Sequence, residues 1–345
     1  MKLITRNGKL LSRGGKAIAR AEAEAEPVET DFIMLIKTDN SGTSEDNEFT
    51  IPTVFGGYNY EVQTSEQSLL NQTGNVTLEW ESAGTYEVRI RGDFPRINFN
   101  NGGDRQKLLQ VQNWGDIEWS SMQNAFRGCN NLELTATDAP DLSSVTNMSR
   151  MFQAASAFNG DLSDWDVNNV TNMGSMFRDA ASFNGDISNW DVSNVTSLSF
   201  VFFGASAFNG DVSNWDVSSV TNMVNMFRDA SSFNQDLSSW DVSNVTIMDR
   251  MFQDASSFNG DISNWDVSNV TNMSTMFNSA SSFNGDVSNW DVSSVTNMSN
   301  MFRDASSFNQ DLSSWCVEQI ASEPFAFAIN ANAWTLPKPN WGDPC

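Results

Sequence analysis

Residues 171–195 read TNMGSMFRDAASFNGDISNWDVSNV, and this 25-residue block decides the fold of the chain. The block recurs seven times without an insertion, from about Val145 to about Val317. A fixed period of this length is typical of a solenoid, in which each unit buries its apolar face against its neighbours. One phenylalanine and one tryptophan mark every copy: Phe158, Phe183, Phe208, Phe233, Phe258, Phe283 and Phe308, and Trp165, Trp190, Trp215, Trp240, Trp265, Trp290 and Trp315.

The spacing of apolar residues within this copy predicts a two-turn helix followed by a short strand. Apolar side chains take positions i, i+3, i+4 and i+7 after Thr171, the predicted N-cap, and Ile187–Val192 reads as the strand. Stacked copies would place the strands in one parallel sheet and the helices opposite, so the predicted fold class is an α/β solenoid, a leucine-rich-repeat-like stack. The predicted helix buries Met173, Met176, Phe177 and Ala180.

A different module is predicted ahead of the repeats. From Asp31 to about Asn100, alternating runs are separated by Asn, Gly, Ser and Asp clusters and indicate a small antiparallel β-sandwich: FIMLIKT, EFTIPTV, YNYEVQT, NVTLEW, TYEVRIR and RINF. The predicted division is a basic arm and linker (1–29), a β-sandwich spacer (30–108), an entry cap (109–144), the seven repeats (145–317) and an exit cap (318–345).

Composition excludes several classes of function. The formal charge of -24 argues against non-specific binding of nucleic acid or anionic membranes by the body of the protein. The chain has no histidine, which excludes Ser-His-Asp and Cys-His catalysis and every His-ligated zinc site. The longest apolar runs, Phe32–Ile36 and Phe325–Ile329, are too short to span a bilayer.

The first twenty residues form a basic arm. They hold six basic and no acidic side chains, so the remainder carries -24 - 6 = -30. Charged residues and glycines interrupt the apolar pairs, and no secretory signal peptide is expected. Such an arm either contacts an acidic partner surface or nucleic acid, the former of which would anchor the protein to an assembly, or is a solvated tail. The candidate anchoring residues are Lys2, Arg6, Lys9, Arg13, Lys16 and Arg20.

The repeats resemble a known family. VTNMSNMFRDASSFNQDLSSWCV (295–317) and its sister copies are similar to the BspA-type leucine-rich-repeat surface proteins, common in marine Bacteroidetes and some of their phages. KTDNSGTSEDNEFTIPT and AGTYEVRIRGDFPRINFNNGGDRQKLLQVQNWGDIEWSSMQNAFRGC resemble the family's leading sandwich and entry cap, and WTLPKPNWGDPC its exit cap. The resemblance implies display on a surface and recognition of another surface, with no catalytic residues. Bacterial members usually begin with a secretion signal and often end in a sorting domain, and neither is evident here.

Two acidic columns recur with the repeat. Equivalent carboxylates on strands roughly 4.8 Å apart would repel each other, so we expect either hydrogen bonds within turns or bound Ca²⁺ to offset the repulsion. The turn-cap interpretation is favoured, and catalytic carboxylate pairs are not expected because the copies offer identical environments. The first column, the candidate ligand face, is Asp161, Asp186, Asp211, Asp236, Asp261, Asp286 and Asp311; the second is Asp166, Asp191, Asp216, Asp241, Asp266 and Asp291.

The tryptophans and methionines are predicted to fill the core rather than to form a sugar-stacking ladder. The repeated Asn and Ser residues form polar rows that either hydrogen-bond within the stack or bind a repetitive ligand such as a glycan. The third copy, SLSFVFFGAS, is more apolar than the others, which reflects either variation within the core, the favoured interpretation, or a contact patch formed by any exposed members. Its distinctive residues are Leu198, Phe200, Val201 and Phe203.

Three cysteines leave one unpaired. Cys316 replaces the usual aspartate of the last copy and Cys345 closes the exit cap, so a disulfide between them is the preferred pairing, and the resemblance supports it. Cys129 is expected to be a buried thiol. Such a bridge would place the protein in an oxidising environment.

The expected function is non-enzymatic recognition or adhesion by a surface-displayed protein. The favoured setting is a phage virion fibre or decoration protein on the virion surface. In that setting the arm contacts other structural proteins, and the solenoid contacts a host glycan or protein. The alternative is a bacterial cell-surface or secreted adhesin, and a carboxylate-based glycoside hydrolase is the least favoured class. No cofactor is expected, apart from the open question of Ca²⁺.

Overall fold

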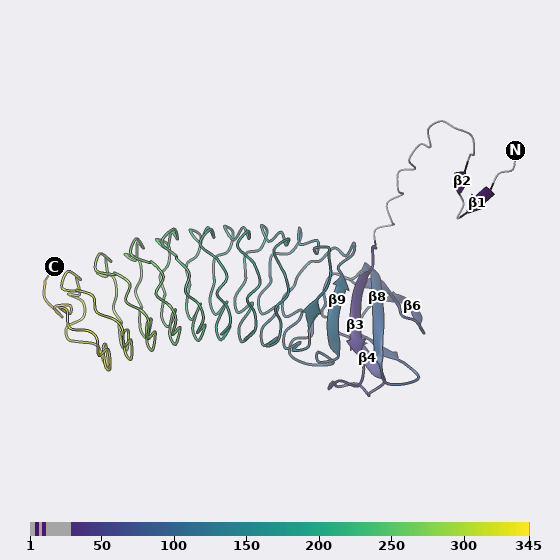
Figure 1. Ribbon diagram of the computed structural model, residues 1–345, viewed down its shortest axis with the longest axis horizontal. Coiled ribbons are helices and arrows are strands. Elements are labelled where there is room, and N and C mark those ends of the chain that lie inside the picture. Colours follow the sequence, from purple (N-terminus) through teal and green to yellow (C-terminus); the bar gives the residue numbers. More distant parts are fainter. Residues whose placement is uncertain (1–3, 7–8, 12–28, 345) are drawn as a thin grey trace.

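The computed structural model describes residues 4–6, 9–11 and 29–344. A β-sheet head is followed by a long stack of coils that runs to the C-terminal end (Figure 1). Two short strands precede the head, β1 (Ile4–Arg6) and β2 (Lys9–Leu11), and they pair antiparallel. Each 25-residue copy makes one coil, so the repeat period seen in the sequence is the period of the stack.

The head contains two sheets. A mixed six-stranded sheet has the order β10-β9-β3-β8-β5-β6, in which β10 and β9 run parallel and the other neighbours antiparallel. β4 and β7 form a separate antiparallel pair. The strands are β3 (Phe32–Lys37), β4 (Glu48–Ile51), β5 (Asn59–Gln63), β6 (Ser68–Gln72), β7 (Val76–Glu79), β8 (Thr85–Asp93), β9 (Leu108–Asn113) and β10 (Glu133–Leu134).

Five of these strands, β3, β4, β5, β7 and β8, coincide with alternating runs in the sequence. The run RINF forms no strand, because its backbone bonds elsewhere: the Asn98 N–H donates to Pro52 and the Phe99 N–H to Ala125 of the first coil. The sheet also extends beyond residue 108, since β9 pairs with β3 and β10 pairs with β9. The head and the start of the stack therefore share one sheet.

The predicted α/β class is wrong: the described part of the chain contains no helix, and the fold is mostly β. In residues 171–180 alternate N–H groups bond within the coil and to the next coil, Met176 to Met173 (3.0 Å) and Phe177 to Val201 (2.9 Å). Ser175 and Asp179 adopt left-handed φ values of 60° and 58°, which an α-helix excludes. Successive tight turns thus give the same apolar spacing as a helix. It follows from the lack of helices that the described residues contain no helical membrane span.

The predicted strand Ile187–Val192 is also not formed, and each coil contributes a single bridge residue to a parallel ladder. Threonines beside this ladder join the coils: both the N–H and the Oγ1 of Thr171 donate to the Thr146 carbonyl (3.0 and 3.2 Å). An asparagine ladder joins them at another side, where the Asn184 N–H donates to Asn159 Oδ1 (2.8 Å). The bridge residues are Asn147, Asn172, Ser197, Asn222, Ile247, Asn272 and Asn297.

Aromatic rings fill the stack and connect it to the head. Phe177 stacks on Phe183 of its own coil at 3.9 Å between ring centroids and on Phe202 of the next coil at 5.7 Å. At the head, Trp114 lies 5.6 Å from Phe32 of β3 and 5.4 Å from Trp165 of the first copy. The core is therefore continuous from sheet to stack, which fixes the coils as one rigid body against the head.

Candidate functional site

The first acidic column lies at a turn on the outside of the stack. Each carboxylate accepts a hydrogen bond from the backbone N–H two residues further on, as from Ser188 to Asp186 at 2.9 Å. This bond lowers the pKa of Asp186, and the Ser188 hydroxyl lowers it further. The charge of Asp186 raises the pKa of Asp211, but the bonds from Ser213 outweigh that repulsion. The other members make the same turn: Asp161, Asp236, Asp261, Asp286 and Asp311.

The second column makes an equivalent turn five residues later, where the Ser193 N–H donates to Asp191 at 3.0 Å. These bonds are the ones that the turn-cap interpretation requires. Within the described residues, no three carboxylates or thiols gather closely enough to hold a metal ion. The remaining members of this column are Asp166, Asp216, Asp241, Asp266 and Asp291.

Most of the predicted anchoring arm lies outside the described residues. Arg6 and Lys9 belong to β1 and β2, whose backbones are described, whereas Lys2, Arg13, Lys16 and Arg20 fall in the segments left undescribed.

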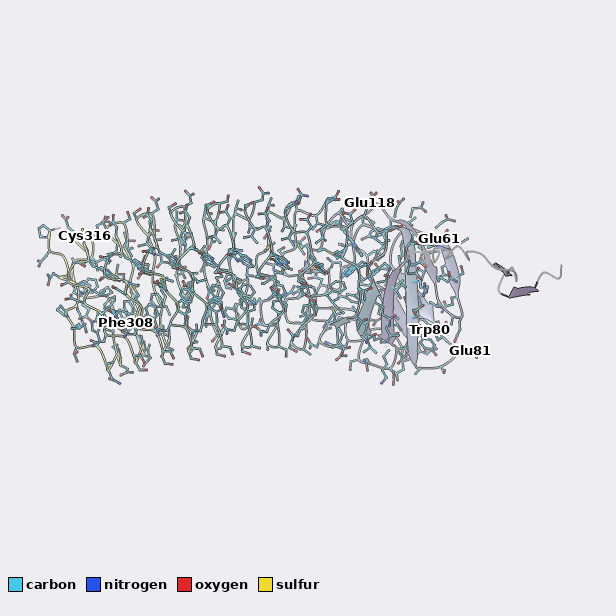
Figure 2. All side chains as sticks on the ribbon, turned by 45° about the horizontal axis from the view of Figure 1, so that its top comes forward. Glu61, Trp80, Glu81, Glu118, Phe308 and Cys316 are labelled. Carbon is cyan, nitrogen blue, oxygen red and sulfur yellow. The ribbon has the colours of Figure 1, made fainter. Side chains whose placement is uncertain are left out.

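Two of the three cysteines are described. Cys316, at the C-terminal end of the stack (Figure 2), is disulfide-bonded, and Cys345 lies outside the described residues. Cys129 is a free, buried thiol, as predicted, and burial raises its pKa.

The tryptophans face the core, so they are not available as a sugar-stacking ladder. The seven equivalent side chains are between 3% and 6% exposed. From the second copy onward, each indole N–H donates to a carbonyl of the preceding coil, as from Trp190 to Leu162 at 3.0 Å. The prediction of a core role is confirmed for them and for Met173 and its equivalents.

Four positions of the block differ most between copies, and all four lie on one side of the coil. They are the positions of Gly174, Ser175, Arg178 and Asp179, which flank the buried Met176–Phe177 pair in a single turn. Arginine, serine, phenylalanine, asparagine and threonine all occur at the Ser175 position, whereas the first acidic column is aspartate in every copy. We name the surface formed by these four positions in all coils the variable face.

The variable face collects the arginines of the repeats. Backbone bonds from Asn124 to Ser149 and from Arg150 to Gly174 set the register, which places Arg127 of the entry cap in line with Arg178. Towards the C-terminal end, arginines pair with an adjacent aspartate. These ion pairs are Arg178–Asp179 (3.3 Å), Arg228–Asp229 (3.3 Å), Arg250–Asp249 (2.9 Å) and Arg303–Asp304 (3.2 Å).

The apolar third copy contributes two half-buried rings to this face. Phe203 lies between the guanidinium groups of Arg178 and Arg228, at 4.8 and 5.1 Å from its ring centroid, and Phe200 lies 5.5 Å from Arg178. Leu198 and Val201 are buried and take no part. The predicted contact patch is thus reduced to Phe200 and Phe203.

An open groove of about 550 Å³ borders the variable face near the head. It exists because the second copy has the smallest residues at two variable positions, Gly174 and Ser175. Other copies fill the Gly174 position with Val224 or Asp249. Hydroxyl and amide groups dominate the lining: Gln123, Ser149, Arg150, Thr171, Asn172, Gly174, Ser175, Thr196, Ser197 and Ser199.

Sequence reasoning centred on the acidic columns missed the variable face. The signal was present in the differences between copies, because the side chains of these half-buried positions lie outside the aromatic core and are free to diverge. The variable positions are recognised as one surface only when the register of successive coils is known. The prediction of a helix gave a different backbone and therefore no such register.

Comparison with known proteins identifies a family for the repeats. Residues 120–240, 186–272 and 226–341 match the family model described as Mycoplasma protein of unknown function, DUF285. These overlapping segments cover the stack from the entry cap to the exit cap, which is more than half of the chain. Neither a curated protein nor a solved structure matches this chain significantly.

Proposed function

The chain belongs to the DUF285 family, whose function is unknown, and we propose from its own surface that it is a non-enzymatic recognition protein displayed outside the cytosol. The observation that carries the proposal is the contrast within each copy. The core phenylalanines and tryptophans, the ladder threonines and the aspartates of the first column are the same in every copy, while the residues of the variable face, most of them half-buried, differ from coil to coil. A rigid scaffold with a diversified exposed face is the arrangement by which repeat proteins bind partners.

Display outside the cytosol is supported by the disulfide at Cys316. Disulfides persist in oxidising surroundings and are rare where cytosolic thiols are kept reduced. Our favoured setting is a virion fibre or decoration protein whose basic arm contacts other structural proteins. A bacterial cell-surface or secreted adhesin is the alternative setting. Mass spectrometry of purified virions and of host-envelope fractions separates the two, and detection only in the cytosol would exclude both.

The recognition role is tested with a chain whose variable face is the same in every copy, which we name the levelled chain. Every copy would receive the residues of the sixth copy, Ser274, Thr275, Asn278 and Ser279, which the stack already accommodates. The levelled and natural full chains are applied to an array of neutral and acidic polysaccharides and immobilised proteins. We expect the levelled chain to keep its circular dichroism spectrum and lose the binding of the natural chain. Equal binding by both chains would contradict the proposal.

A further inference from the structure

The entry end of the variable face concentrates positive charge in a chain that is strongly acidic overall. We name Arg127, Arg150 and Arg178 the entry patch. Among the described residues, neither Arg127 nor Arg150 forms an ion pair; Arg127 donates instead to the neutral side-chain carbonyl of Asn100 (3.0 Å). The later arginines, in contrast, have adjacent aspartates. Within the entry patch, Arg178 also pairs with Asp179 (3.3 Å), so the uncompensated charge comes from Arg127 and Arg150.

These arginines are close enough to influence one another. Burial lowers the pKa of Arg127, and the charges of Arg150 and Arg178 lower it further. Like charges held together within a folded protein raise the local positive potential, which an anionic group placed between them would relieve. A guanidinium also offers the forked donor geometry that matches a carboxylate or sulfate group.

The phenylalanines restrain the far end of the patch. The ring of Phe203 packs against Arg178 on one side and Arg228 on the other, and Phe200 adds a second contact to Arg178. Packing of this kind limits the rotamers of a long side chain before a ligand arrives, so less conformational entropy is lost on binding. Together with the ion pair to Asp179, these contacts restrict the positions open to Arg178 compared with an unpacked surface arginine.

The groove beside Arg150 supplies the uncharged part of a site. Its lining of serine, threonine and asparagine can hydrogen-bond to sugar hydroxyls and offers no apolar hollow for a protein side chain. Coils follow one another at roughly the strand spacing of 4.8 Å, so the groove and the patch extend along the axis of the stack. A linear polymer is the ligand shape that such a surface accommodates.

We propose that the entry patch and the adjoining groove bind a linear acidic polysaccharide, with the arginines on its carboxylate or sulfate groups and the groove on its sugar hydroxyls. This assignment rests on the proposed recognition function and names its ligand class and site. The formal charge of -24 opposes long-range attraction of any polyanion, so binding depends on the local positive potential of the entry patch and on the hydrogen bonds of the groove.

The test uses the full chain and matched arginines. Arg150 and Arg250 are both exposed and occupy the same position of their coils, with φ values of 58° and 57°. Asparagine occupies this position in Asn225 and Asn300, so the backbone of the coil accommodates both replacements. Arg250→Asn also removes the ion pair with the buried Asp249 (2.9 Å), and a combined Asp249→Ser/Arg250→Asn variant controls for that loss. Binding to alginate, dextran sulfate and neutral dextran is measured by biolayer interferometry at low salt. We expect Arg150→Asn to weaken binding about ten-fold and Arg250→Asn less than about two-fold.

A second variant tests the groove without altering charge. Gly174→Val introduces the residue found at Val224. A Cβ on Gly174 would lie 3.3 Å from Asn172 Oδ1, a tight contact, but the same pair of residues coexists in Asn222 and Val224 two coils later. Filling the groove should weaken binding about ten-fold, whereas Ser274→Val at the same position of the sixth copy should leave it unchanged. Preserved melting temperatures show that the variants are folded.

The outcomes separate this inference from the broader proposal. Preference for alginate or for dextran sulfate identifies a carboxylate or a sulfate ligand, and loss of binding at 200 mM salt supports the role of charge. Equal effects of Arg150→Asn and Arg250→Asn, or no binding to either charged polymer, would overturn the site. Equally tight, Arg150-dependent binding of polyglutamate would overturn the polysaccharide assignment. In each case, a different ligand that the levelled chain fails to bind would still uphold recognition by the variable face.

Discussion

Replacing Trp240 by phenylalanine should destabilise the middle of the stack by about 2 kcal/mol. The indole is 3% exposed, and its N–H donates to the Val212 carbonyl at 2.9 Å. That carbonyl also accepts the Trp215 N–H (3.1 Å), so the substitution does not leave it without a partner. The lost hydrogen bond then costs about 1 kcal/mol, and the cavity left by the smaller ring adds about as much.

Urea unfolding followed by circular dichroism measures the total change, and hydrogen exchange with mass spectrometry locates it. Because each coil contacts only its neighbours, faster exchange should be confined to the coils around Trp240 and spare the head. Asn244→Ser is the matched control: it removes an exposed bond to Ser218 (2.8 Å) but introduces the residue of Ser219, and we expect a change within about 0.5 kcal/mol. Equal stability of the Trp240→Phe variant and the natural protein would refute the reasoning.

Three further substitutions test other features of the stack. Gly260→Ala should lower the free energy of unfolding by about 2 kcal/mol, and by more than Gly285→Ala does, as measured by thermal unfolding. A Cβ on Gly260 meets the backbone carbonyl of Gln235, whereas a Cβ on Gly285 meets the ring edge of Phe283 at 2.9 Å. A larger loss for Gly285→Ala would contradict this reasoning. Burial raises the pKa of Asp249 although Arg250 opposes it, so the charged carboxylate destabilises the fold above that pKa. Asp249→Ser should therefore increase the free energy of unfolding at pH 7, and the increase should vanish below about pH 4. An increase that does not depend on pH would be inconsistent with this cause. The thiol of Cys129 should react with a thiol reagent only when the protein unfolds, and rapid labelling of the native chain would disprove its burial. Cys129→Ser should lower the free energy of unfolding by about 1–3 kcal/mol, because the serine hydroxyl would be buried.

The sequence predicted the period of the stack and its buried residues, but not the backbone that carries them. Phe177 and Met176 are buried as the spacing indicated. The same spacing arises from a helix or from tight turns in which alternate N–H groups bond to the next coil, as from Phe177 to Val201. Periodicity of side chains cannot separate these two, because they differ only in where the backbone hydrogen bonds go and in the left-handed φ of residues such as Ser175.

In the head, local alternation predicted β3, β4, β5, β7 and β8 but not β6, whose segment SLLNQ lies at the sheet edge and has no buried residue. β9 and β10 were missed because tertiary pairing decides them: β9 pairs with β3 from the other end of the head, and β10 pairs parallel to β9 from within the entry cap. The turn role of Asp186 followed from its neighbours in sequence, which supply its hydrogen bonds. The entry patch could not be predicted from neighbours in sequence, since only the register of successive coils brings Arg127 and Arg178 together.

The junction between copies is the same throughout the array: valine, then threonine, as in Val270–Thr271 and Val295–Thr296. Excising residues 271–295 would recreate that junction and leave both ends of the molecule unchanged. The length of the stack therefore changes in steps of one coil, roughly 4.8 Å each. Genetic recombination between copies can change the distance between the exit cap and the head while it preserves the entry patch.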